Sequence, residues 1–374
     1  MSVRLIATSD NHLRRSQYST TQRGDDFTKA FEQIIDIAIN TKVAAVMQTG
    51  DLLDSKSPAS RALVVLAKAH HRLRKAGIPM IIVEGDHDQE EPHWVDAMKA
   101  YGIEETPSDG GLIILHDQLY TIPGTKLTVY GQSFIGKTKE RFLEIKDTLP
   151  QADILMWHTM CKDFAGFLAD QAVSIAELPT DKYRLIALGD LHVCDYKRAG
   201  DCLVGYPGSS ELVKKDEPLM KTISLFDIPD SGPIPEPKLL PLLTRLVKVY
   251  RLLKEEDVVR VLTELEACAD QHPIILGRYD SRIPDVVKRI YAKVDADKCI
   301  VRLQPLPEIE LPNCDVSTPI PERTMVSFLP EFIQPGSELF EVATALLNPE
   351  AAVITILTEF VDKRLAAMGE PSPL

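Results

Sequence analysis

The first half of the chain alternates short apolar runs with longer segments whose apolar residues recur at helical spacing. The apolar runs predict strands, and they lie at 3–8, 43–49, 79–84, 112–115, 127–130, 154–157, 184–188 and 222–227. The amphipathic segments predict helices at 27–40 and 58–76. Gly77 follows the second segment directly and is a typical helix stop. Strands interleaved with helices favour an α/β fold, which we expect to be a layered β-sandwich core flanked by helices.

The second half of the chain predicts two further parts. A proline-rich stretch, 229–241, indicates a linker. It is followed by strand, helix, strand, helix and strand patterns at 246–252, 255–269, 273–278, 283–294 and 299–303. A second proline-rich stretch precedes a tail with amphipathic helical patterns. We therefore expect a main domain over 1–228, a small α/β domain over 243–305 and a helical C-terminal tail over 322–370.

Length and composition are those of a globular protein with more than one domain. The 374 residues exceed what one typical hydrophobic core organises. No apolar run reaches the length of a membrane span, and the N-terminus lacks the features of a signal peptide. The six cysteines are scattered without a C-x-x-C pair, which favours reduced thiols over a zinc or redox site. These features predict a cytoplasmic protein without a membrane segment.

The formal net charge of -13 argues against a protein that holds nucleic acid on a broad basic surface. Any binding of DNA must then come from local basic groups, bound cations or a partner chain. The candidate local groups are Arg14, Arg15, Lys137, Lys139, Arg141, Lys214 and Lys215. Each of them, taken alone, is more simply a solvated surface charge.

Five short motifs fall at or just past the ends of predicted strands. They are Asp10-Asn11-His12, Gly50-Asp51, Gly85-Asp86-His87-Asp88, Trp157-His158 and Gly189-Asp190-Leu191-His192. Loops beyond the carboxyl ends of strands are where ligands bind in α/β sheets. Aspartate and histidine together bind divalent ions such as manganese, iron or zinc. A carboxylate can also bridge two ions about 3.5–4 Å apart, the spacing used in phosphoester chemistry.

Each motif also has a simpler interpretation. A single D-x-H after a strand is more often a capped turn, a single G-D is usually a turn, and a single histidine such as His158 is most often structural. Five such motifs in order, all at strand ends, favour a metal site. The other histidines, which are His70, His71, His93, His116 and His272, fit structural roles.

The ordered set resembles the calcineurin-like metallophosphoesterase superfamily, whose pattern is D-x-H, G-D, G-N-H-[DE], H and G-H-x-H. Within it the chain is similar to SbcD-type DNA repair exonuclease subunits of bacteria and phages. The narrower likeness rests on the segments 50–58 (GDLLDSKSP), 183–189 (YRLIALG) and 205–209 (GYPGS), with Asp216-Glu217 soon after. The likeness is strong over 1–228, moderate over 243–305 and weak beyond.

The resemblance implies a role for each matching residue. A first ion would be held by Asp10, His12, Asp51 and His192, and a second by Asp51, Asp86, His158 and Asp190, with Asp51 bridging. His87 would be the general acid, and a water activated by the two ions would be the nucleophile. The implied ions are manganese, with magnesium as the alternative. The implied activity is exonuclease action on duplex ends and endonuclease action on single strands.

Two positions depart from the family pattern. Asp86 stands where the family has asparagine, and Asp190 stands where it has the first histidine of G-H-x-H. Both fall on the implied second ion. Because aspartate is a hard oxygen ligand, we expect a modified rather than lost site, one that favours manganese or magnesium over softer ions. The added negative charge is expected to weaken the Lewis acidity of that ion and to lower activity.

The resemblance also implies partners. The module at 243–305 resembles the family's DNA-capping domain, and the tail lies where the family binds its SbcC-type SMC-like ATPase in a complex that processes double-strand breaks. The helices at 58–76 and 92–100 lie where the family forms its homodimer. Their apolar residues Leu63, Val64, Leu66, Leu73, Trp94 and Met98 either form that face or pack on the sheet.

Two other functions stay open from the sequence. One is a metallophosphoesterase acting on a small substrate such as a cyclic nucleotide or a phosphoprotein. The acidic net charge favours that reading, whereas the small module and the tail argue against it. The other is a scaffold in which the altered second ion site no longer turns over, and the intact Asp10, His12, Asp51 and His87 argue against it.

Overall fold

The computed structural model describes residues 2–306 except 19, 57, 89–93, 95–109, 133, 137–138, 166–171 and 296–297. The expected helical tail at 322–370, the residues His93 and Met98, and Lys137 lie outside the described residues. Within the part that is described, no helix has both the length and the apolar character needed to cross a membrane.

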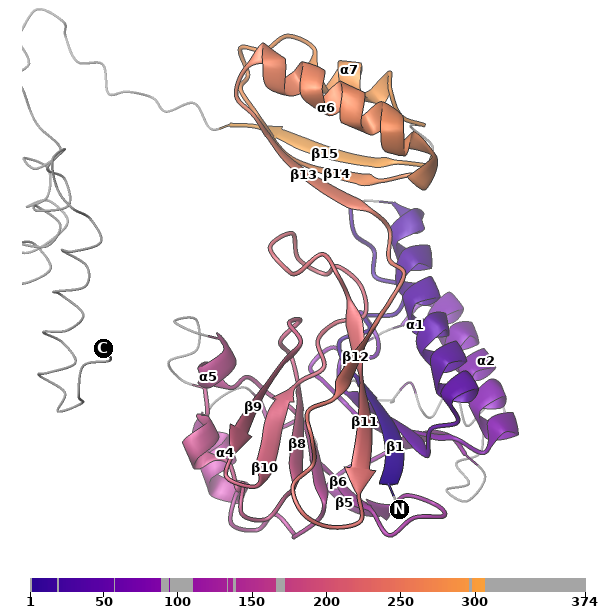
Figure 1. Cartoon of the computed structure of the whole chain (residues 1–374), viewed down its shortest axis with the longest axis vertical. Helices are drawn as coiled ribbons and strands as arrows, with labels where there is room; N and C mark the ends of the chain where they lie inside the picture. Colours follow the sequence, from indigo (N-terminus) through magenta and orange to yellow (C-terminus); the bar gives the residue numbers. More distant parts are fainter. Residues whose placement is uncertain are drawn as a thin grey trace, which may run out of the picture. The chain divides into compact units, whose positions relative to one another are not determined.

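The main part of the chain contains two six-stranded mixed sheets (Figure 1). The first has the order β12-β11-β1-β2-β3-β4, and its strands are β1 Ser2–Thr8, β2 Ala45–Thr49, β3 Pro79–Val83, β4 Gly111–Ile114, β11 Thr222–Pro229 and β12 Lys238–Pro241. The second has the order β5-β6-β7-β8-β10-β9, and its strands are β5 Gln118–Thr121, β6 Thr128–Gln132, β7 Ile154–His158, β8 Leu185–Gly189, β9 Asp195–Ala199 and β10 Cys202–Tyr206. In each sheet the four neighbours β1-β2-β3-β4 and β6-β7-β8-β10 run parallel.

Successive side chains of each strand point to opposite faces of its sheet. One face of each sheet therefore packs against the other sheet, and the two share an apolar layer. Met47 of β2 and Met156 of β7 belong to the same buried cluster between the sheets. The outer face of the first sheet packs on α1 Thr21–Thr41 and α2 Ser60–Ala76, which lie side by side (Figure 1). The outer face of the second sheet packs on α4 Lys139–Ile145, α5 Lys162–Ala165 and η2 Ile175–Glu177. The layered α/β sandwich expected from the sequence is confirmed.

A small module follows β12 in the chain. Its parallel sheet has the order β13-β14-β15, with β13 Val247–Leu252, β14 Ile274–Tyr279 and β15 Ile300–Pro305. The helices α6 Glu255–Cys268 and α7 Val286–Tyr291 cover one face, and the short η3 Ala269–Gln271 follows α6. The opposite face contacts the main part through a small cluster that joins Leu212 and Tyr18 to Leu276. Every strand and helix predicted for 243–305 is present, with bounds shifted by a few residues.

Arg245 ties the module to α1. Its guanidinium donates to both carboxylate oxygens of Asp26 at 2.7 and 2.8 Å, and to the carbonyl oxygens of His272 and Lys298. Asp26 also pairs with the fully buried Arg23, whose NH1 lies 2.9 Å from Asp26 Oδ2. A buried, bidentate pair of this kind fixes orientation as well as position.

Three details differ from the sequence predictions. α1 begins at Thr21 instead of 27, because the Thr20 side chain accepts a hydrogen bond from Gln22 N and caps a longer helix. The strands β5, β9 and β10 were not predicted, and neither edge strand, β5 or β9, has a fully buried residue that would show as an apolar run. The predicted linker at 229–241 was wrong for its last four residues, because β12 pairs antiparallel with β11.

The apolar residues of the proposed dimer helices mostly pack inward. Leu66, Leu73 and Trp94 are buried in the cluster between the first sheet and its helices, and Leu63 packs against that cluster. Val64 is 53% exposed and faces outward. Of the candidate contact residues that the structure describes, only Val64 is therefore exposed to a partner.

Candidate metal centre

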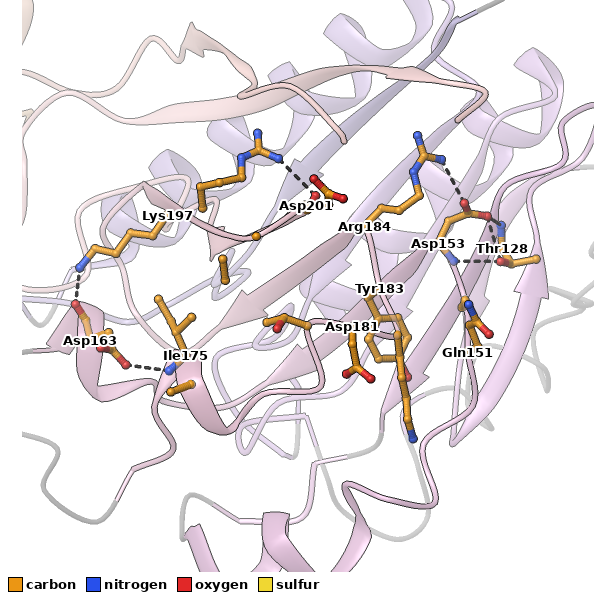
Figure 2. Close-up of a pocket in the computed structure, with 17 residues that line it drawn as sticks. Thr128, Gln151, Asp153, Asp163, Ile175, Asp181, Tyr183, Arg184, Lys197 and Asp201 are labelled. Carbon is orange, nitrogen blue, oxygen red and sulfur yellow. Dashed lines mark hydrogen bonds and ion pairs between the residues drawn. The ribbon is translucent and has the colours of Figure 1, made fainter. Parts of the chain in front are cut away.

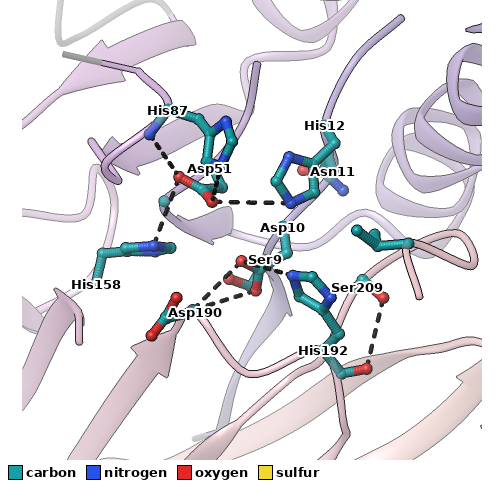
Figure 3. Close-up of polar contacts among 12 residues, drawn as sticks. Ser9, Asp10, Asn11, His12, Asp51, His87, His158, Asp190, His192 and Ser209 are labelled. Atoms are coloured by element: carbon teal, nitrogen blue, oxygen red, sulfur yellow. Dashed lines mark hydrogen bonds and ion pairs between the residues drawn. The ribbon is translucent and has the colours of Figure 1, made fainter. Parts of the chain in front are cut away.

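The five motifs meet at the carboxyl ends of the parallel strands. Asp10 and His12 follow β1, Asp51 follows β2, and Asp86 and His87 follow β3. His158 ends β7, while Asp190 and His192 follow β8. Because the two sheets run with these ends on the same side, the motifs from both sheets converge on one place (Figure 3).

Asp51 lies at the centre of this cluster. Its Oδ2 is 3.7 Å from His12 Nε2 and 3.9 Å from His87 Nε2, and its Oδ1 is 3.5 Å from His158 Nε2. The backbone N–H of His87 also donates to Asp51 Oδ1 at 3.1 Å. One carboxylate from the first sheet thus faces histidines carried by three other strands (Figure 3).

Two flanking groups complete the cluster. Asp10, His12 and His192 offer atoms within 4.8 Å of one another on one side. Asp86, His158 and Asp190 do the same on the other side, with His158 Nε2 at 3.3 Å from Asp86 Oδ1. The structure therefore brings together all eight residues selected from the sequence, and none of them lies elsewhere.

The loop backbones are fixed in sparsely populated conformations. Asp10, His12, Asp51 and Asp190 all have positive φ angles, of 48°, 41°, 52° and 98°. Asp10 N donates to Gly50 O, and His12 N donates to Asp51 O, both at 3.0 Å, so the loops after β1 and β2 hold each other. Such strained backbone clusters at functional sites, where the surrounding structure holds it in place.

Gly50 allows the two sheets to approach here. Its φ is 97°, and a Cβ at this position would collide with the imidazole of His158 from the opposite sheet. The glycine is thus required both by its backbone conformation and by the close approach of His158.

The hydrogen bonds of the histidine rings determine which nitrogen faces the cluster. His158 Nδ1 lies 2.9 Å from the carbonyl oxygen of Thr49, which can only accept, so Nδ1 carries the proton and Nε2 points inward. His192 Nδ1 lies 2.6 Å from Glu217 Oε1 with the same consequence. His87 Nδ1 lies 2.9 Å from the carbonyl oxygen of Asp54. Each ring therefore presents Nε2 to the cluster, and metal-binding histidines are commonly oriented by such a second hydrogen bond.

Burial and charge in the cluster favour a cation. Burial raises the pKa of Asp10 to about 6, and burial lowers the pKa of His12 well below its usual value. Burial alone would also lower the pKa of His158, but the carboxylates of Asp86 and Asp51 outweigh it and raise that pKa to about 10. The carboxylates thus favour positive charge in a cluster whose central donors are buried, while His87 and Asp86 at its edge stay 41% and 34% exposed.

Three supporting carboxylates had no predicted role. Asp88 is buried and accepts hydrogen bonds from the backbone N–H groups of Leu52, Leu53 and Gly85, which fixes the loop after Asp51. Asp54 Oδ1 pairs with Arg15 at 2.5 Å and lies 3.6 Å from His12 Nδ1. Glu217 binds His192 and, at 2.6 Å, Lys221. All three stand in or beside the sequence motifs, but their hydrogen-bond partners depend on the fold.

The residues present suit divalent metal ions. Among the described residues, His158 Nε2 and both ring nitrogens of His12 are buried without a hydrogen-bond partner. A buried polar atom left unpaired is costly, and a metal ion would satisfy these nitrogens. Mixed carboxylate and imidazole donors match manganese, iron or zinc.

A hollow of about 1220 Å³ lies at the other end of the second sheet, at the amino ends of β7 and β8 (Figure 2). Its cations already have partners: Lys182 donates to three backbone carbonyls, and Arg184 binds Asp153 and two carbonyls. Lys197 donates to the carbonyl of Asp163. None of the eight converging residues lines it, so its size does not make it the functional site.

Comparison with known proteins identifies the family of the chain. The family model described as calcineurin-like phosphoesterase matches residues 3–209. Relatives named DNA double-strand break repair protein Mre11 include one from Methanosarcina mazei, 28% identical over 62% of this chain and 37% of its own length. Those of Sulfurisphaera tokodaii and Sulfolobus acidocaldarius are 30% and 32% identical, each over 58% of this chain and 56% of their own length. The chain thus aligns with less than two thirds of each of these relatives. It belongs to the calcineurin-like phosphoesterase family.

Proposed function

We propose that this chain is a metal-dependent phosphodiesterase that cuts DNA, the nuclease subunit of an SbcCD-type complex that processes DNA ends. The observation that carries the proposal is the position of Asp51 between His12 and His158, at 3.7 and 3.5 Å from their Nε2 atoms. One carboxylate between two imidazoles from different sheets is the arrangement that a bridging ligand of two ions requires.

Two sets of side chains would hold the two ions. Asp10, His12, Asp51 and His192 would bind the first, and Asp51, Asp86, His158 and Asp190 the second. Bound there, the ions supply positive charge that neutralises a phosphodiester and lowers the pKa of water. The oxygen-rich second set favours manganese, with magnesium as the alternative.

His87 is placed to deliver a proton. Its side chain is 41% exposed, so substrate can reach it. Its Nδ1–H is held by the carbonyl oxygen of Asp54, so a second proton on the ring must reside on Nε2. Nε2 lies 3.9 Å from Asp51 Oδ2 at the centre of the cluster, where it can protonate the leaving oxygen of a phosphodiester.

DNA as the substrate is supported by the relatives named for double-strand break repair and by a basic patch on the small module. Arg251 of β13 and Arg278 of β14 are neighbours in the register of the parallel sheet, and both lie on the sheet face opposite α6 and α7. Both are exposed, and neither has an ion pair with another described residue. Like charges placed opposite each other are destabilising, so the pair suits an anionic ligand such as a phosphate backbone.

The patch formed by Arg251 and Arg278 can bind DNA locally although the net charge of the whole chain is acidic. A chain of net charge -13 cannot attract DNA over its whole surface, but two neighbouring arginines without an ion pair to any described residue make a local positive site. We propose that an SMC-like ATPase supplies further phosphate contacts and binds the tail at 322–370, and that the protein acts as a homodimer.

The test combines metal, substrate and one variant. Linear duplex DNA, single-stranded DNA and a chromogenic phosphodiester are incubated with the protein and manganese, with and without a chelator. We expect chelator-sensitive cleavage of DNA, and a fall in kcat of roughly 10²–10⁴ in His87→Gln with unchanged manganese binding by calorimetry. Cleavage of the chromogenic ester without cleavage of DNA would indicate a small-substrate enzyme. Cleavage that survives the chelator would overturn the metal mechanism.

A further inference from the structure

A cavity of about 250 Å³ adjoins the candidate metal centre. It is lined by Asp190 and His192 of that centre, by Phe164 at the end of α5 and by Lys214 in the loop after β10. Because Asp190 and His192 line the cavity and also belong to the candidate metal centre, a ligand in the cavity lies next to a phosphodiester bound at that centre.

One wall of the cavity is an aromatic ring that is held in place. Phe164 packs edge-on against the buried Tyr206, with ring centroids 5.1 Å apart. Tyr206 is itself fixed by hydrogen bonds to Thr159 O and from Cys161 N. Lys197 Nζ lies 4.7 Å from the Phe164 centroid and also donates to the carbonyl of Asp163. The Phe164 ring is thus oriented before any ligand arrives, which limits the entropy that binding costs.

The remaining lining is apolar inside and charged at the rim. Leu191 and Val193 line the cavity, and Val193 is 45% exposed although it is aliphatic. The Lys214 side chain is exposed and has no ion pair with another described residue. An aromatic and aliphatic wall beside a free ammonium group fits a flat apolar group attached to an anion.

The acidic residues at the rim of the cavity exclude one class of ligand. Asp195 and Asp216 are exposed and line the same cavity, so a small free anion would be repelled. Carboxylates accept hydrogen bonds from amino groups, which nucleobases carry on their edges. A volume of about 250 Å³ accommodates one nucleoside and excludes a base pair with its backbone.

Resting on the proposed function, we infer that this cavity binds one unpaired nucleotide next to the scissile phosphate, with its base stacked on Phe164 and a neighbouring phosphate near Lys214. Stacking of a base on an aromatic side chain is tolerant of sequence, so the cavity would select unpaired strands over particular bases. A paired nucleotide must unpair and unstack from its helix to enter, which costs free energy that an unpaired nucleotide does not lose.

The test uses single-stranded oligonucleotides with a normal or an abasic residue on either side of one cleavable phosphodiester, the other linkages being phosphorothioates. In Phe164→Ala we expect KM for the normal oligonucleotide to rise about tenfold, and Phe164→Trp to restore it. On the oligonucleotide whose abasic residue falls at the cavity, wild type and Phe164→Ala should have the same KM. Lys214→Ala should raise KM on both oligonucleotides, whereas Lys126→Ala, at an exposed lysine between β5 and β6, should not.

The outcomes separate the two proposals. If wild type cuts the oligonucleotides and Phe164→Ala raises KM equally on the normal and both abasic ones, the cavity does not bind a base, while the nuclease assignment stands. If Phe164→Trp fails to restore KM, stacking is excluded. If wild type cuts none of the oligonucleotides with manganese, the nuclease assignment fails first, and this inference fails with it.

Discussion

The imidazole of His192 donates from Nδ1 to Glu217 Oε1 over 2.6 Å, and this hydrogen bond leaves Nε2 at 3.8 Å from Asp10 Oδ1. Glu217 is in turn bound by Lys221 Nζ and by the backbone N–H groups of Val213 and Lys214. Burial would raise the pKa of Glu217, but the hydrogen bond from His192 and the charge of Lys221 lower it to about 2. Glu217 is therefore an anion that positions a candidate metal ligand.

Glu217→Gln is expected to weaken binding of the first ion. The amide can still accept from His192 but no longer provides a charge that raises the basicity of Nε2, so we expect a loss of about 10–100-fold in manganese affinity. Titration calorimetry measures the change, and Asp216→Asn, an exposed neighbour outside these hydrogen bonds, is the matched control. Equal affinities in Glu217→Gln and Asp216→Asn would show that the carboxylate has no such role.

The two unusual aspartates predict a change in metal preference. Asp86 and Asp190 both lie within 4.8 Å of His158 donor atoms, and both replace softer or neutral family residues. In the double variant Asp86→Asn and Asp190→His we expect relative activity with zinc or cobalt over that with magnesium to rise at least several-fold, because an imidazole replaces a hard oxygen ligand. The ratio of rates with each ion in wild type and variant measures this. An unchanged ratio would mean that these side chains do not bind the second ion.

The sequence was enough to predict that the eight candidate residues converge. It was not enough to predict the contacts, such as that of Glu217, which orient them. Asp51 follows β2 of the first sheet and His158 ends β7 of the second, so both lie at the carboxyl ends of parallel strands, where ligands bind in α/β sheets. Glu217 lies 25 residues beyond His192 in a loop, and its contact depends on how that loop folds back. β12 was missed because its four residues, Lys238–Pro241, do not alternate between apolar and polar and none is fully buried, and its pairing with β11 comes from tertiary structure.

The paired arginines of the small module predict how DNA binding depends on salt. Arg251 and Arg278 are neighbours across two strands, so replacing both by glutamate should weaken DNA binding at low salt by about tenfold or more and reduce the slope of log affinity against log salt by about two. Arg260→Glu on α6, where the exposed Arg260 pairs with Asp257, is the control on the other face. Fluorescence anisotropy with a labelled duplex at several salt concentrations measures both quantities. If Arg260→Glu has the same effect as the pair, the loss reflects net charge rather than a binding face.

His70 predicts a pH dependence of stability away from the candidate metal centre. The side chain is buried on α2, and its Nδ1 accepts a hydrogen bond from Leu112 N at 3.0 Å, which requires a neutral ring. Burial lowers its pKa in the folded protein below the ordinary value of 6.5, and the positive charge of Arg74 adds to the effect. Below about pH 6.5 the unfolded chain binds a proton at this histidine, whereas the folded protein does not. The free energy of unfolding therefore decreases as the pH falls, with a limiting slope of about 1.4 kcal/mol per pH unit for one proton.

This contribution is absent above the unfolded-state pKa and ends at the pH where the folded ring itself becomes protonated. His70→Gln keeps an acceptor for Leu112 N without a titrating group, so its free energy of unfolding should fall less steeply between pH 7 and pH 5 than that of wild type. Urea unfolding at several pH values, with a chelator present, measures the difference in slope, and the exposed His71→Gln is the control. Parallel pH profiles for wild type and His70→Gln would mean that the ring is protonated in the folded protein and that the hydrogen bond from Leu112 does not hold it neutral.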